Sequence, residues 1–109
     1  MAKAYVKPGA CGLESKIVVT RKDGDADKYD VDIHIETESD NVKRLAKVLT
    51  EANGLDECFQ NFSTSKVYQL GAEVGLHLAC PVPCAIIKAI EVECGFALPR
   101  NVEITIDRD

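Results

Sequence analysis

The sequence lacks a long apolar run. No stretch of its 109 residues approaches the roughly 20 apolar residues that a membrane-spanning helix requires. Residues 1–8 also lack the apolar core of a signal peptide. We therefore expect a cytoplasmic protein with no membrane association.

Runs of basic residues are absent as well. The chain carries 13 Lys and Arg against 18 Asp and Glu, which gives a formal net charge of −5 at pH 7. Proteins that bind a phosphate backbone gather basic side chains on one face. The charge balance therefore predicts no nucleic-acid partner.

Signatures of several enzyme classes are also missing. There is no Gly-rich phosphate loop, no Ser-His-Asp order and no catalytic carboxylate pair, and we expect Glu91 and Glu93 on a solvated helix face. The alternating aspartates of residues 23–27 resemble the start of a calcium loop. However, Lys28 stands where that loop needs glycine, and His34 stands where it needs glutamate. We expect a hairpin turn at 23–27, and the sequence names no reaction.

The chain has the length and apolar content of one domain, with 46% hydrophobic residues. Tyr29, Val31, Ile33 and Ile35 alternate with polar residues, which predicts a strand with one buried face. Strands are expected at residues 3–7, 15–21, 29–36 and 102–106, and helices at 39–53, 63–78 and 81–94. We predict a single α+β domain over residues 1–109. It is a two-layer sandwich in which a three- or four-stranded, mostly antiparallel sheet carries two or three helices on one face.

Five cysteines are a high number for so short a chain. A reducing compartment disfavours disulfides, so metal binding or redox chemistry is the expected use of these thiols. Cys58 has no spacing to another candidate ligand, and we expect it to be structural or merely exposed. Cys94 falls on the apolar stripe of a predicted helix and is expected in the core.

Residues 77–91 hold the most unusual chemistry. Cys80 is spaced to act as N-cap of a helix that begins at Pro81, and Pro83 still falls in the first turn, where a missing N–H costs no hydrogen bond. The free N–H groups of that turn favour a thiolate at Cys80. Cys84 follows one turn later on roughly the same side, so the two sulfurs can meet one metal ion or each other.

A metal or iron–sulfur site is the first hypothesis for these residues. Thiolates and imidazole suit zinc and iron, and Cys11, His77, Cys80 and Cys84 would complete a tetrahedral site. Cys11 lies in a glycine-flanked loop, although the spacing of the other three matches no standard zinc knuckle. Such a site would serve electron transfer, cluster handling or an accessory role beside an anaerobic enzyme.

Two other hypotheses remain open. In one, Cys80 and Cys84 form a redox dithiol, or Cys80 is a nucleophile with His77 as its base. In the other, the domain binds no metal and serves as an interaction or oligomerisation module, with another protein or a second copy as its partner. Changing Cys80 to Ser separates the three, through loss of metal, loss of thiol reactivity or no effect.

Three motifs carry a resemblance over nearly the whole chain: PGACG at residues 8–12, CPVP at 80–83 and KAIE at 88–91. With these motifs the sequence resembles a family of small uncharacterised cysteine-containing proteins of anaerobic bacteria and archaea. The resemblance implies the cytoplasm of an anaerobe, which favours an iron–sulfur cluster over zinc. It also implies that the position of Cys84 is less often cysteine than that of Cys80.

Overall fold

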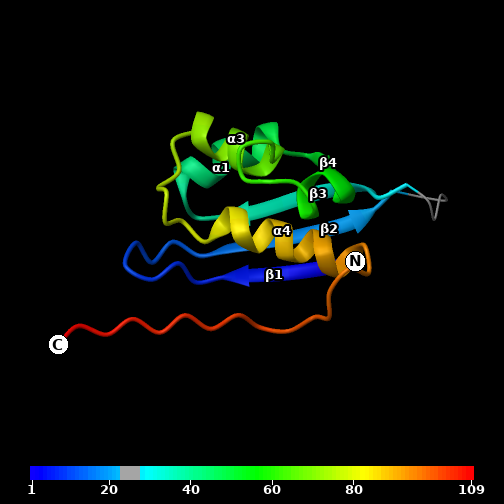
Figure 1. Ribbon diagram of the computed structural model, residues 1–109. Helices are drawn as coiled ribbons and strands as arrows, with labels where there is room; N and C mark the ends of the chain where they lie inside the picture. The colour runs from blue at the N-terminus through cyan, green and yellow to red at the C-terminus, as the bar shows by residue number, and fades with distance from the viewer. Residues whose placement is uncertain (23–27) are drawn as a thin grey trace.

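The computed structural model describes residues 1–22 and 28–109, and the predicted hairpin turn at 23–27 lies outside them. In this part of the chain, four antiparallel strands form one sheet, and helices pack on one of its faces (Figure 1). The elements are β1 (Ala2–Val6), β2 (Ser15–Arg21), β3 (Asp30–Thr37), α1 (Asp40–Val48), β4 (Glu51–Asn53), α2 (Gly54–Cys58), α3 (Lys66–Glu73) and α4 (Val82–Glu93). The predicted α+β class and its mostly antiparallel sheet are confirmed.

The strands follow each other in chain order across the sheet, β1-β2-β3-β4. Ile17 in β2 lies between Ala4 of β1 and Ile35 of β3, and Val19 lies between Ala2 and Ile33. Side chains on one face of a sheet come from every second residue, so this register brings the apolar residues of three strands to the same side. The opposite face carries polar side chains such as those of Lys3, His34 and Glu36, which are exposed.

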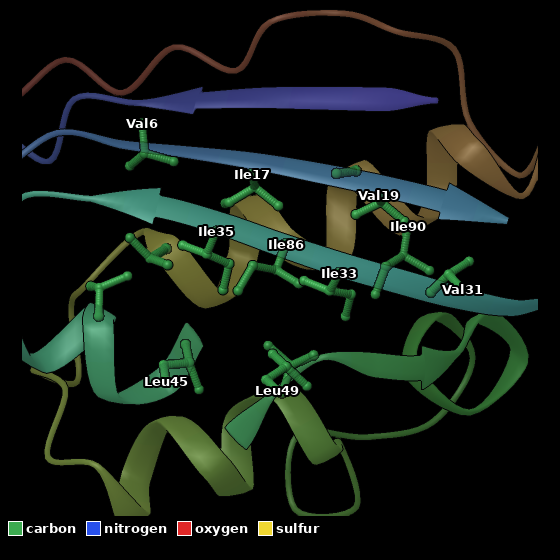
Figure 2. Packing of buried hydrophobic residues seen from close by; sticks show 14 of the residues in the cluster. Val6, Ile17, Val19, Val31, Ile33, Ile35, Leu45, Leu49, Ile86 and Ile90 are labelled. Carbon is green, nitrogen blue, oxygen red and sulfur yellow. The ribbon is translucent and has the colours of Figure 1, made fainter. Parts of the chain in front are cut away.

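The core lies between that apolar sheet face and the helices (Figure 2). Helix α4 packs on β1 and β2, while α1 packs on β3. Ile86 and Ile90 of α4 lie one turn apart and are fully buried, as are Leu45 and Leu49 from α1 and its C-cap. Each buried side chain of this kind contributes about 1.5–3 kcal/mol. Cys94 belongs to this core, as predicted.

The region after α1 differs from the prediction of one helix through residue 53. Helix α1 ends at Val48, and residues Glu51–Asn53 form the short strand β4 on the edge of β3. Gly54 therefore begins α2 instead of ending α1. A Cβ at this position would lie 2.6 Å from Sγ of Cys94, so the close packing of α2 on α4 requires glycine.

The helices on either side of residues 77–80 are shorter than predicted. Helix α3 ends at Glu73 because the chain reverses at Gly75, whose φ of +82° suits only glycine well. Helix α4 begins at Val82 with Pro81 at its N-cap and no side-chain cap. The prediction that Cys80 caps this helix is wrong, because Cys80 lies in the preceding turn, where its N–H donates to the His77 carbonyl at 3.0 Å.

The predicted strand at residues 102–106 is also wrong. The structure assigns no strand to residues 97–109, which run extended and exposed beyond the β1 edge of the sheet (Figures 1 and 2). Their alternating sequence meets the local requirement for a strand, but a strand also needs a hydrogen-bonded neighbour.

Among residues 1–22 and 28–109, none of the helices has both the length and the apolar character that a membrane-spanning segment requires.

Candidate functional site

The four predicted ligands come from two loops and one helix. Cys11 lies exposed in the connection between β1 and β2, and His77 and Cys80 lie in the connection between α3 and α4. Both connections lie at the same end of the molecule, near the first turn of α4 (Figure 1). Cys84 lies on that first turn and is exposed.

The side chains of these four residues face different surroundings. Cys80 is partly buried and packs against the core, whereas Cys84 faces solvent. Across residues 1–22 and 28–109, no three His, Cys, Asp or Glu side chains lie close enough together to hold one metal ion. A site made of Cys11, His77, Cys80 and Cys84 would therefore need the two loops to close on it, and it stays a prediction.

Cys84 instead lines an open groove of about 470 Å³. One wall of the groove is α4, and the other is formed by α3 and the segment between α2 and α3. Its lining side chains include those of Phe62, Tyr68, Cys84, Ile87, Lys88 and Glu91. The groove thus combines apolar surface with a thiol, a phenol, an ammonium group and a carboxylate.

The α4 wall follows directly from helix geometry. Cys84, Ile87, Lys88 and Glu91 are three, four and seven positions apart, so they share one face of the helix. The opposite face carries Ile86, which is fully buried in the core. Helix periodicity therefore predicts from the sequence that Cys84 lies off the main apolar stripe. No sequence pattern predicts the facing wall of the groove.

Aromatic side chains shape the facing wall. The rings of Phe62 and Tyr68 meet edge to face, with centroids 5.3 Å apart and planes at 88°. Burial raises the pKa of Tyr68, and the nearby Cys84 raises it further. The phenol therefore stays protonated at neutral pH and can donate a hydrogen bond beside the thiol.

Glu57 joins α2 to the start of α3 behind this wall. Its side chain is buried, and its carboxylate accepts hydrogen bonds from Ser65 Oγ at 2.8 Å, Val67 N at 2.9 Å and Lys66 N at 3.1 Å. Free N–H groups at a helix N-terminus favour a negative charge. Glu57 thereby fixes the helix that carries Tyr68. This role of Glu57 could not be predicted from the sequence, because residues 55–62 show no clear periodicity.

A second groove, of about 710 Å³, lies on the β4 side of α2 and is lined mainly by polar and charged residues. Lys22 contacts Glu51 at 2.6 Å and Asp32 at 3.0 Å. Hydrogen bonds to these carboxylates, Glu51 first, raise the pKa of Lys22 to about 12. Lys66 Nζ donates to the Glu51 carbonyl at 2.9 Å. Several polar groups of this groove, those of Lys22, Glu51 and Lys66, thus contact one another.

Cys58 and Cys94 lie apart from the predicted ligands. Burial, with smaller contributions from the nearby Glu91, Cys94 and Glu57, raises the pKa of Cys58 to about 12. Burial also raises the pKa of Cys94. Both thiols therefore stay protonated and unreactive at neutral pH. Cys94 is buried, as predicted, and Cys58, for which a structural or an exposed position was expected, is partly buried.

Glu93 departs from the solvated position predicted for it. Its side chain is only 13% exposed, and its carboxylate accepts from the backbone N–H of Arg21 and pairs with the N-terminal ammonium, each at 2.9 Å. Burial by itself raises the pKa of Glu93, but the hydrogen bond from Arg21 and the ammonium group outweigh burial and lower the pKa. Glu93 therefore ties the end of α4 to β2 as a carboxylate.

Comparison with known proteins gives a family but no activity. The sequence model of a family described as "Family of unknown function (DUF6951)" matches residues 2–106. Neither the curated proteins nor the solved structures gave a match.

Proposed function

Since the chain belongs to DUF6951, a family of unknown function, we propose its function from the groove itself: the protein binds a small ligand there and reacts with it through the thiol of Cys84. The observation that carries this proposal is the position of Cys84. It is an exposed thiol inside a groove that also presents Tyr68 and Lys88. Small-ligand sites have this general form, with apolar walls and a few convergent polar groups.

The groove suits a ligand that has an apolar part and a polar part able to contact both Lys88 and Glu91. Phe62 and Ile87 offer apolar contacts, and Lys88 offers a positive charge one turn from the thiol. With a small disulfide as ligand, Cys84 Sγ attacks one sulfur, a mixed disulfide forms, and the other half leaves as a thiolate. The electrons balance within this exchange, so no further oxidant is required.

Thiol modification tests the proposal on the folded protein. We expect an aromatic disulfide reagent to modify Cys84 before Cys11, although both thiols are exposed, because only Cys84 has the groove to bind the aromatic ring. Peptide mapping by mass spectrometry at successive times gives the order. Cys58 and Cys94 should react only after unfolding, since burial raises their pKa values.

Matched variants separate binding from simple exposure. Phe62→Ala removes an apolar wall and should slow the reaction of Cys84 while leaving that of Cys11 unchanged. Iodoacetamide has no aromatic ring, so it should modify Cys84 at nearly the same rate in the wild-type protein and in Phe62→Ala. Equal rates for Cys84 and Cys11 with the aromatic reagent would refute the proposal.

A metal or iron–sulfur site is the second candidate, and one observation favours it. The loop with Cys11 and the loop with His77 and Cys80 lie at the same end of the molecule (Figure 1). Glycines flank the first loop on both sides of Cys11, so its backbone can adjust. These three residues, with Cys84 as fourth ligand, would hold zinc or a cluster, in keeping with a cytoplasmic accessory protein of an anaerobe.

Anaerobic purification without chelators tests this candidate. Iron and acid-labile sulfide in stoichiometric amounts with visible absorption would indicate a cluster, and zinc alone would indicate a structural ion. Cys80→Ser should abolish the metal but should leave disulfide exchange at Cys84 intact. Protein that stays metal-free after reconstitution with iron and sulfide or with zinc contradicts the candidate.

A further inference from the structure

Residues 101–107 form a strand-like segment that the single chain leaves unused. Val102, Ile104 and Ile106 alternate with polar residues, and they are 55%, 75% and 87% exposed. Apolar side chains in such an arrangement normally cover one face of a sheet. This segment therefore has the pattern of a strand without the neighbour that a strand needs.

The sheet has a free edge of matching length. In the described part of the chain, β1 pairs with β2 on one side and has no strand on the other. It contains neither proline nor a bulge, so nothing in it prevents a further strand from pairing. Exposed regular edges of this kind are sites of strand addition.

The two surfaces are complementary in charge. On β1, Lys3 and Tyr5 point to the open face of the sheet, and Lys16 of β2 lies over the Tyr5 ring at 5.9 Å. A strand that places Val102, Ile104 and Ile106 on the helix side must place Glu103, Thr105 and Asp107 on this open face. The added strand would therefore bring two carboxylates beside a basic part of the sheet.

The direction of the chain favours a second molecule as the partner. Figure 1 shows residues 97–109 running past β1 in the same direction as β1, so pairing within one chain would be parallel. No backbone hydrogen bond joins this segment to β1 in the part that the structure describes. All other pairs in the sheet are antiparallel, and antiparallel pairing is the more stable form. A twofold-related copy can supply its segment in that direction.

We propose that two copies of this chain form a closed dimer in which residues 101–107 of each add a fifth strand to the free β1 edge of the other. Each copy gives one strand and receives one, so the β1 strands of both copies gain a partner. The exchange covers the exposed apolar residues and the β1 edge in one step. This proposal does not depend on the reactivity of Cys84.

Light scattering coupled to size exclusion tests the proposal on the full chain. We expect a dimer whose amide protons at residues 102–106 are protected from exchange. Ile104→Lys should give a monomer and abolish this protection. Leu98→Lys is the matched control, because Leu98 is similarly exposed at 71% but lies before the proposed strand, and it should remain a dimer.

A charge swap gives a second test. Glu103→Lys with Asp107→Lys should weaken the dimer, and Lys3→Glu with Lys16→Glu in the same chain should restore it. A monomeric full chain with a protected segment would show pairing within one molecule and overturn the proposal. A monomeric chain without protection, or a dimer that survives Ile104→Lys, would overturn it as well.

Discussion

Replacing Glu57 by Gln tests the link between α2 and α3 most directly. The carboxylate accepts three hydrogen bonds from the first turn of α3. Gln keeps one oxygen but turns the other into an NH₂ group, which faces a backbone N–H instead of accepting from it. The substitution therefore removes a charge and sets two donors against each other in a buried place.

The size of the effect follows from the number of bonds affected. Losing one hydrogen bond to a charged group costs about 1.5–3 kcal/mol, and losing the charge at a helix N-terminus adds about 0.3–1 kcal/mol. We expect Glu57→Gln to lower the free energy of unfolding by about 3 kcal/mol. For a domain of this size the melting temperature should fall by about 10–20 °C.

Urea unfolding followed by circular dichroism measures this change. Asp56→Asn is the control, since it makes the same carboxyl-to-amide change in the same helix at an exposed position, and it should shift stability by less than about 0.5 kcal/mol. Glu57→Gln should also change the rate at which the aromatic reagent modifies Cys84, because α3 carries Tyr68. A loss no larger than that of the control would refute the role given to Glu57.

Two further predictions concern packing and pH. Gly54→Ala should lower the free energy of unfolding in urea by about 1–3 kcal/mol, because the added Cβ would lie 2.6 Å from Cys94 Sγ and 3.3 Å from Tyr29. Adding Cys94→Ala should recover part of this loss. Full stability of Gly54→Ala would contradict the contact. The pKa of Glu93 is lower in the folded protein than the ordinary value of 4.5. The hydrogen bond from the Arg21 N–H to its carboxylate therefore stabilises the fold fully at pH values above 4.5, and this stabilisation is lost as the pH falls through the lowered pKa. Glu93→Gln should therefore destabilise at pH 7 and have little effect below that pKa, and a pH-independent difference would refute this account.

Much of the fold could be predicted from local patterns. The β-branched run of β2 and the alternation of β3 gave strands that the structure confirms, because burial on one face of a sheet requires that period. Helix lengths were harder, because they depend on Gly75 and on β4, a three-residue strand that forms only against β3. Local sequence carries little information about such a pairing.

The candidate site was predictable only in part. The position of Cys84 outside the apolar stripe of its helix indicated an exposed thiol, and the structure agrees. The helix-capping role of Cys80 was wrong, because the chain turns between His77 and Cys80 before α4 begins. The groove beside Cys84 depends on Phe62 and Tyr68, which come from other parts of the chain, and no spacing rule connects them to it.

The sequence by itself determined the α+β class, the strand at β2, the buried face of β3 and the core positions of α4. These properties follow from side-chain periods that repeat within a few residues. Tertiary structure decided the features that join distant segments. It set the groove at Cys84, buried Glu57 at the start of α3, and left residues 101–107 without a strand partner. Each of these depends on which elements meet in space, and local propensity does not specify such meetings.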